Sequence, residues 1–405
     1  MQRKPAEIAM REAVQKPNRP TGLEMQVPKT LIGVPQSGYN TDRNILGSLP
    51  EWTIRARPWD VWRLRSSVRY KLTGQLMQME QFRFAAPHYP RVALMHFFNS
   101  TSSATTPWIS TFETSMPRWG EVRMRVRQRG LAMLLSPSCR KLIALSDAAQ
   151  NIAIAEWRQH LGDEAAQQLE MKTEVLLPPQ AVAQNVVDRQ AGPIHFAFVG
   201  ADFYRKGGLE FLQGLARLPR ANLAEWRATI IGRLDSFGDY ASATDASSQR
   251  EALELIGRLG TRVVHRPAAS RSVVMETMRN AHFFMFPTLA DTFGYAALEA
   301  QSCGAVLIST NVRALPEINS CETGIVLKLP LDARREFHRH PNMIQEKARL
   351  VDAIEAALHE ALGMGEERRR KLAEAAARQL RSRHDPTLHR NRIDAIYKAA
   401  LGMRD

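Results

Sequence analysis

The sequence predicts an α/β protein with two domains of Rossmann size, and three observations support this prediction. The chain has 405 residues, which is long for a single core and sufficient for two. Residues 282–308 pass from a short apolar strand through a loop and a helix into a second apolar strand, the order of a parallel βαβ unit. Prolines and polar residues between 178 and 190 interrupt the apolar pattern, as an interdomain linker does.

The first 28 residues contain four prolines and no sustained apolar period, so we expect an irregular N-terminal extension over residues 1–28. A first domain is predicted at residues 29–185, where short apolar runs end in turn residues. Ser146 or Asp147 is the expected N-cap of a helix that follows its last central strand. The predicted strands are Thr30–Val34, Arg91–Phe97, Trp108–Phe112 and Lys141–Ser146.

A second domain is predicted at residues 186–380, again from short apolar runs that alternate with helical patterns. After it, a helical pattern from Lys371 to Leu401 is interrupted at Asp385-Pro386. The predicted strands of this domain are Ile194–Val199, Ala228–Gly232, Arg262–His265, Phe283–Phe286 and Ala305–Ile308.

The segment between the last two of these strands has the pattern of a ligand site. A helix is predicted to begin near Gly294 and to end before Gly304, and its N-terminus would offer free N–H groups and a positive dipole end to an anion. Asp291 in the loop and Glu299 in the helix suit the hydroxyls of a sugar or ribose, because carboxylates repel phosphate. Each acid alone is equally typical of an ordinary loop or helix face. Together they predict a site for a phosphorylated ligand that also carries hydroxyl groups.

A turn with two basic residues follows the strand Ile194–Val199. Arg205 and Lys206 stand in front of Gly207 and a predicted helix, so they would lie at the carboxyl end of the same sheet. Lysine delivers a compact charge to a diphosphate, and arginine offers a planar pair of donors. This pattern predicts a second anion-binding turn.

These residues resemble the retaining GT-B glycosyltransferases of family 4, which use nucleotide-sugar donors. An acid, seven residues and then Glu, with Phe-Gly between them and Glu-Ala-x-x-Cys-Gly-Ala-Val at the end, is similar to the signature of that family. The resemblance implies a GT-B fold, in which two Rossmann-like domains face each other across a cleft and residues 381–405 form a C-terminal helix that returns to the first domain. It implies that Asp291 contacts the donor sugar, that Phe293, Gly294 and Tyr295 approach the diphosphate at the Phe-Gly turn, and that Glu299 holds the ribose.

Three positions depart from the family pattern. Asp291 stands where the family has Glu, and its shorter side chain would reach the sugar differently. In the family's Gly-Arg-Leu-x-x-x-Lys-Gly element the lysine corresponds to Lys206, but Ala201 replaces the arginine, so Arg205 would supply the second charge. Glu113 stands where many members have a histidine near the donor sugar, and we expect it to bind sugar hydroxyls or stabilise positive charge at the anomeric carbon, although a strand-end acid can equally cap backbone N–H groups. The resemblance also places Pro267 beside the nucleotide base.

Composition limits the choice of partners. The net charge is +14, and residues 52–71 interleave tryptophan and tyrosine with arginine and lysine, which suits an anionic membrane surface. A solvated basic face is an equally strong interpretation. No nucleic-acid-binding signature accompanies the charge, the three cysteines have no metal-ligand spacing, and no apolar run is long enough to cross a bilayer. We therefore expect a cytoplasmic protein, free of metal and cofactor, that is peripheral to the inner face of a membrane if it binds one.

The expected function is transfer of a hexose from a nucleotide sugar, UDP- or GDP-linked, to an acceptor hydroxyl with retention of configuration. Lipid-linked and saccharide acceptors, in polysaccharide or glycolipid biosynthesis, fit the basic and aromatic first domain. The alternative is a GT-B protein that binds a nucleotide sugar with lost or altered catalysis and acts as a partner or scaffold, since three motif positions depart from the pattern. A phosphorylase is disfavoured because no pyridoxal-binding lysine motif is present.

Overall fold

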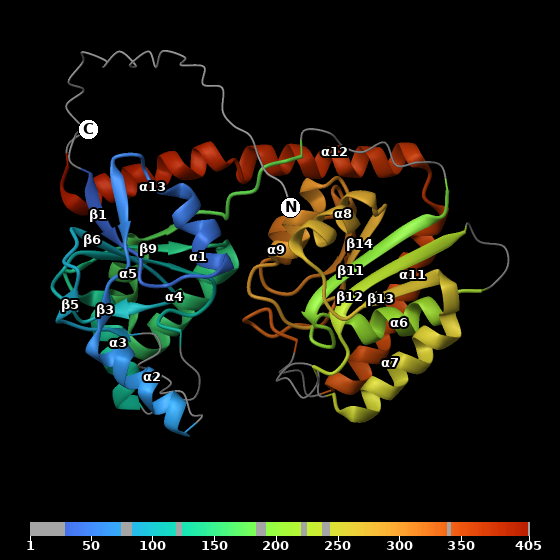
Figure 1. The fold of residues 1–405 in the computed structure, drawn as a ribbon, viewed down its shortest axis with the longest axis horizontal. Helices are drawn as coiled ribbons and strands as arrows, with labels where there is room; N and C mark the ends of the chain where they lie inside the picture. Colours follow the sequence, from blue (N-terminus) through green and yellow to red (C-terminus); the bar gives the residue numbers. More distant parts are fainter. Residues whose placement is uncertain are drawn as a thin grey trace, which may run out of the picture.

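The computed structural model describes residues 29–73, 83–118, 124–183, 192–219, 225–236, 244–337 and 342–403. Two parallel sheets of six strands each form the centres of two domains, and the last two helices lie along one side of both (Figure 1). The predicted extension at residues 1–28 lies outside the described residues.

The first sheet has the strand order β10-β9-β8-β6-β1-β2, with every neighbouring pair parallel. Its central strands β6 and β8 are buried at every residue, as expected for a sheet covered on both faces. Two short pairs lie beside it, β3 (Trp59–Asp60) with β5 (His88–Tyr89) and β4 (Arg83–Phe84) with β7 (Thr101–Ser102). The six strands are β1 (Thr30–Gly33), β2 (Thr53–Ala56), β6 (Leu94–Phe98), β8 (Trp108–Phe112), β9 (Cys139–Ala144) and β10 (Thr173–Val175).

The helices of the first domain follow its strands. Ser146 caps α4 by accepting a hydrogen bond from the Ala149 N–H, so the first of the two predicted caps is the one used. The elements are α1 (Tyr39–Asn44), the 3₁₀ turn Leu46–Ser48, α2 (Val61–Thr73), α3 (Met124–Leu135), α4 (Asp147–Leu161) and α5 (Asp163–Lys172).

The second sheet has the strand order β13-β12-β11-β14-β15-β16, also fully parallel. Its centre is aromatic, because Phe196 and Phe283 stack on adjacent strands with ring centroids 5.5 Å apart. The strands are β11 (Ile194–Asp202), β12 (Trp226–Arg233), β13 (Val263–Arg266), β14 (Phe283–Phe286), β15 (Val306–Thr310) and β16 (Gly324–Leu327). The helices are α6 (Gly208–Arg217), α7 (Ala246–Leu259), α8 (Arg271–Asn280), α9 (Tyr295–Ser302), α10 (Leu315–Ile318) and α11 (Met343–Gly363), with a 3₁₀ turn at Gly260–Arg262.

The predicted strands match the central strands of both sheets, with small differences at their ends. The strand predicted at Arg91–Phe97 begins three residues later, at Leu94, and the one predicted at Lys141–Ser146 begins and ends two residues earlier, at Cys139 and Ala144. The edge strands β2, β10 and β16 were not among the predicted strands. All three have four residues or fewer, and β2 carries arginine within an aromatic and basic stretch.

The C-terminal helices connect the two domains. α12 (Glu366–Arg383) packs on the second domain, and α13 (Pro386–Leu401) packs on the first, as Figure 1 shows. Asp385 caps α13 through the N–H groups of Thr387 and Leu388, at the interruption that the sequence predicts. Tyr397 of α13 lies 2.7 Å from Nδ1 of the buried His96, whose Nε2 lies 2.8 Å from the Thr111 hydroxyl. Both ring nitrogens of His96 therefore form hydrogen bonds inside the protein.

Candidate functional site

The two predicted anion-binding turns lie side by side because their strands are neighbours. β11 pairs with β14 in parallel, so the turn after β11 and the loop after β14 leave the sheet at the same edge. A backbone hydrogen bond of 2.9 Å from the Leu289 N–H to the Arg205 carbonyl joins them. This arrangement brings Lys206 and Asp291 into an ion pair whose side chains are both largely buried.

Asp291 is held as a carboxylate by this pairing. Burial opposes its ionisation, but the nearby Lys206 ammonium and its hydrogen bond outweigh burial and lower the pKa of Asp291 below its usual value. The Phe293 N–H also donates to Oδ1 at 3.3 Å. Lys206 in turn lies with Nζ 5.3 Å from the centroid of the Phe286 ring. A fixed positive and a fixed negative charge therefore stand together at the strand ends.

Arg205 fixes the loop that carries Asp291. Its guanidinium pairs with Asp202 and donates to the Ala290 carbonyl at 2.9 Å. The turn is possible because Gly207 has φ +76°, and a Cβ atom there would lie 2.0 Å from the Pro287 carbonyl oxygen. The two residues of the predicted basic pair therefore have different roles. Lys206 pairs with Asp291, the candidate sugar-binding acid, and Arg205 supports the backbone at Ala290.

The N-terminus of α9 has the conformation that the Phe-Gly turn predicts. Gly294 is the N-cap residue with φ +102°, and no side chain caps the helix. A Cβ atom on Gly294 would lie 2.7 Å from a methyl carbon of Leu315. The Phe293 side chain is buried, with its ring centroid 5.2 Å from that of Tyr295 and 6.4 Å from that of His384. The prediction that Phe293 contacts a donor is therefore limited to its backbone.

Glu299 contacts the first domain, which sequence reasoning did not predict. Its Oε1 accepts a hydrogen bond of 2.6 Å from the Tyr39 hydroxyl of α1 and lies 3.6 Å from an Arg43 nitrogen. Arg271, at the start of α8, approaches the same oxygen at 3.4 Å. The sequence predicts a turn at residues 35–40, of which 39 and 40 open α1, but it does not indicate this contact, because the partners are 260 residues apart.

A second contact joins α1 to the start of α9. Asn44 donates to the Tyr295 hydroxyl at 2.8 Å, and the rings of Tyr39 and Tyr295 meet edge to face with centroids 5.7 Å apart. Arg43 lies 5.0 Å from the centroid of the Tyr295 ring and donates to the Pro179 carbonyl of the linker. The first domain therefore closes directly over the candidate ribose and diphosphate positions.

Glu113 lies at the carboxyl end of β8, in the first domain. It is buried, and its Oε1 receives hydrogen bonds from Asn99 at 3.2 Å and Arg118 at 2.7 Å. Its other oxygen, Oε2, is buried without a hydrogen-bond partner among the described residues. Burial first, and then the negative charge of Glu113, raise the pKa of Tyr295. Glu113 is therefore close enough to act electrostatically on the first residue of α9.

The remaining candidate, Pro267, is exposed directly after β13, at the same edge of the second sheet as the two turns. Beside Glu299, a cavity of about 350 Å³ is bordered by Tyr39, Asp42, Arg43, Arg271 and the linker residues 179–181. In the described part of the chain, no group of three histidine, cysteine or acidic side chains has the arrangement of a metal site.

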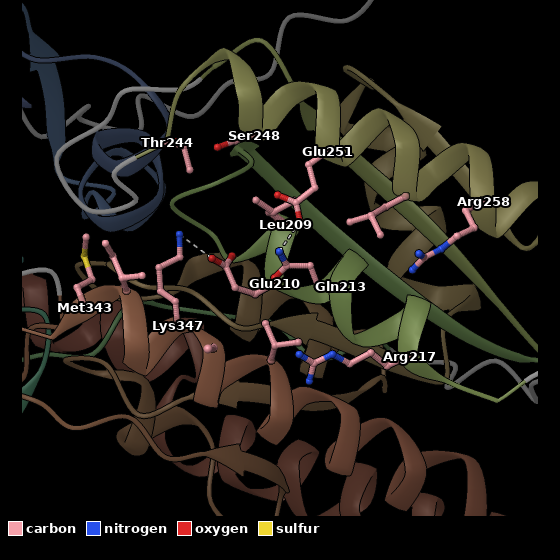
Figure 2. A pocket seen from close by; sticks show the side chains of 14 residues that line it. Leu209, Glu210, Gln213, Arg217, Thr244, Ser248, Glu251, Arg258, Met343 and Lys347 are labelled. Atoms are coloured by element: carbon pink, nitrogen blue, oxygen red, sulfur yellow. Dashed lines mark hydrogen bonds and ion pairs between the residues drawn. The ribbon is translucent and has the colours of Figure 1, made fainter.

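A larger cavity of about 620 Å³ lies between α6, α7 and α11, and none of the predicted site residues borders it (Figure 2). Glu210 and Lys347 form an ion pair of 2.8 Å across it, and Gln213 donates to Glu251 at 2.6 Å. Arg217, which also borders the cavity, pairs with Asp352 and Glu355 outside its lining.

Comparison with known proteins finds a family match over the second domain. Residues 182–379 match the family model described as "Glycosyl transferases group 1". The "D-inositol 3-phosphate glycosyltransferase" of Paenarthrobacter aurescens (strain TC1) is 30% identical over 136 residues, which are 33% of this chain and 31% of that relative. The alignment therefore spans less than a third of the relative's length.

Solved structures resemble nearly the whole chain. The glycosyltransferase from Rickettsia africae ESF-5 has a TM-score of 0.57 at 13% identity and covers 92% of this chain and 98% of its own. Anabaena Alr3699/HepE, solved in complex with UDP, has a TM-score of 0.56 at 12% identity and covers 91% of this chain and 100% of its own. At these identities the likeness concerns the fold. It confirms the predicted GT-B architecture, and the family model confirms the resemblance to the family in the second domain.

Proposed function

We propose, from a second domain that belongs to the glycosyl transferases group 1 family and a chain with the GT-B fold, that this protein is a glycosyltransferase. It transfers a hexose from a nucleotide sugar to an acceptor hydroxyl. The observation that carries the proposal is the Lys206–Asp291 pair beside the uncapped N-terminus of α9. A cation, a carboxylate and free N–H groups at one sheet edge match the diphosphate and the sugar of such a donor.

The donor binds by exchanging partners with this ion pair. The diphosphate takes Lys206 and the first N–H groups of α9, because a doubly charged group competes well with a single carboxylate. Asp291 is then free to accept hydrogen bonds from sugar hydroxyls, and Glu299 accepts those of the ribose. Pro267, exposed beside β13, borders the place of the base.

The chemical step requires stabilisation of the departing nucleoside diphosphate. Lys206 and the dipole of α9 stabilise its negative charge, and Arg205 holds the loop that positions them. As the family resemblance implies, Lys206 on the loop that Arg205 supports takes the place of a metal ion, and the anomeric configuration is retained. Glu113 lies on the opposite domain. Its Oε2, which has no hydrogen-bond partner among the residues that the structure describes, can bind a sugar hydroxyl or stabilise positive charge on the anomeric carbon.

The acceptor is a saccharide or a lipid-linked molecule in polysaccharide or glycolipid biosynthesis, and α2 supports the lipid-linked form. Val61, Leu64, Val68 and Leu72 are spaced three or four residues apart along α2 and are all about half exposed or more. Exposed Arg65, Arg69 and Lys71 accompany them, and the helix contains no acid. A basic helix with an exposed apolar stripe suits an anionic membrane surface.

The structure alters the composition of this membrane surface. Trp52, which the sequence pattern includes in it, donates its indole N–H to Asp394 of α13 and packs on the core. The aliphatic stripe of α2 and the exposed Trp59 take its place. None of the helices in the described ranges combines the length and the apolar character that crossing a bilayer requires.

Vesicle sedimentation tests this surface. We expect the protein to bind vesicles with anionic lipid and the double variant L64E/V68E to lose that binding. The matched control, M171E/L253E, changes two other exposed apolar side chains by the same charge and keeps it. Equal sedimentation of all three proteins would reject the membrane surface.

Calorimetric titration with UDP, GDP and ADP, followed by incubation with the corresponding glucose donors, tests the catalytic proposal. UDP is the first choice, because the structurally similar HepE was solved with it. We expect one of the nucleotides to bind. The glucose of the corresponding donor should then be released slowly to water or transferred to an acceptor. Binding without any release or transfer would favour the alternative of a nucleotide-sugar-binding protein, and no binding would reject both.

A further inference from the structure

Tyr39 occupies the carboxylate that the proposed function assigns to the ribose. Glu299 Oε1 receives the Tyr39 hydroxyl at 2.6 Å while Arg43 and Arg271 approach the same oxygen. A carboxylate oxygen has two lone-pair sites, and the hydrogen bonds from Tyr39 and Arg271 fill both of them on Oε1.

A ribose that binds Glu299 needs the same oxygen that Tyr39 contacts. Its 2′- and 3′-hydroxyls are adjacent donors that match the two oxygens of a single carboxylate. Such a bidentate contact needs Oε1 as well as Oε2, and Oε1 is taken. We propose that Tyr39 competes with the ribose for Glu299 and thereby sets the affinity of the site for nucleosides. This inference rests on the proposed function of the site.

The surroundings of Tyr39 allow it to leave. Tyr39 is about 40% exposed, and it borders the cavity of about 350 Å³ beside the linker. The cavity gives the side chain room to turn away from Glu299 while Asn44 keeps α1 attached to Tyr295. The exchange is therefore a movement of one side chain within the closed arrangement of the two domains.

Tyr39 enters this competition as a neutral hydrogen-bond donor. Burial is the largest cause that raises its pKa, and the hydrogen bond to Glu299 acts in the same direction, against the charge of Arg43. The phenol therefore keeps its proton at neutral pH. A ribose hydroxyl, also a neutral donor, replaces it without a change of charge.

The variant Y39F tests the inference, because it keeps the ring and removes only the competing hydroxyl. We expect UDP to bind about three- to tenfold more tightly, the effect of one hydrogen bond. Inorganic pyrophosphate, which has no ribose, should bind Y39F and the natural protein equally. The control variant Y89F removes an exposed hydroxyl from β5 and should change neither affinity.

The outcomes separate this inference from the proposed function. If the natural protein binds neither UDP nor any other nucleotide, the proposed function fails. If it binds UDP and Y39F binds UDP equally or more weakly, the competition is rejected while the proposed function stands. A gain for UDP that pyrophosphate shows to the same extent would also reject it, because the effect would then be independent of the ribose.

Discussion

Lys206 and Asp291 are 85 residues apart in the sequence and form an ion pair at the point where β11 and β14 end. The pair satisfies both charges in the absence of a donor, and the donor diphosphate is proposed to take Lys206 from Asp291. A buried charge that loses its partner lowers the stability of the folded protein. Substitutions of Lys206 and of Asp291 are therefore expected to affect stability, donor binding and sugar transfer in different ways.

Removing the cation should abolish the proposed reaction. We expect K206A to lower sugar transfer by at least about a hundredfold, because it removes the charge that stabilises the leaving diphosphate. It also leaves Asp291 buried without its partner, so the melting temperature should fall. Assays of donor turnover and thermal unfolding, with the exposed K371A as control, check both effects. Turnover close to that of the natural protein would remove Lys206 from the mechanism.

Removing the carboxylate should separate binding from catalysis. In D291N the lysine is released from its ion pair, so UDP and pyrophosphate should bind more tightly while sugar transfer declines. The reason is that Asp291 competes with phosphate but is proposed to hold the sugar. Titration calorimetry and turnover assays test this, and D352N, which changes an exposed acid on α11, is the control. Weaker pyrophosphate binding by D291N would contradict the proposed exchange.

Glu113 should matter for the sugar and not for the nucleotide. We expect E113Q to reduce transfer by about tenfold or more while UDP affinity stays constant, because the residue belongs to the opposite domain and its buried Oε2 has no hydrogen-bond partner in the described part of the chain. The exposed E374Q provides the matched control. Unchanged transfer by E113Q would assign Glu113 to structural support of Asn99 and Arg118 alone.

Acid should weaken the attachment of α13 to the first domain. Burial lowers the pKa of His96 to about 3 and those of His384 and His389 to about 4. The unfolded chain takes up protons on these residues near pH 6.5 and the folded chain does not, so stability is full above that pH and falls as the pH drops toward 4. Urea unfolding between pH 7.5 and 5 should show this decline.

The histidine variants provide the control for that pH dependence. H389Q removes one of the three buried rings, which lies 2.8 Å from the Ser48 hydroxyl, and should reduce the slope of stability against pH. H359Q changes an exposed histidine of α11 and should leave the slope unchanged. Equal slopes in both variants would exclude His389 as a cause.

The turn before α6 should tolerate only glycine. G207A places a Cβ atom against the Pro287 carbonyl at positive φ, so we expect a lower melting temperature and weaker UDP binding. G257A, in the last turn of α7 with open space around it, should instead stabilise the protein, by up to about 0.5–1 kcal/mol. Differential scanning calorimetry distinguishes the two, and an unaffected G207A would show that the turn can rearrange.

The central strands and the turn glycines could be predicted from the sequence, but an edge strand could not. Strand β14 was predicted at its observed bounds, since four apolar residues before Pro287 can form little else in this context. The glycines that shape the turns were also predictable, because Gly294 and Gly304 adopt the positive φ that glycine alone adopts readily. The edge strand β2 was missed, since its pairing with β1 is not visible in its arginine-containing sequence.

The sequence by itself determined the two-domain α/β architecture, the helix mouth at Gly294 and the presence of acids and bases near it, because these follow from local periodicity and backbone preference. Only the tertiary structure decided that Lys206 pairs with Asp291, that Tyr39 holds Glu299 from the other domain, and that Trp52 is tied to α13. These contacts join residues 85, 260 and 342 positions apart. They depend on strand order and domain closure, which no local pattern of residues specifies.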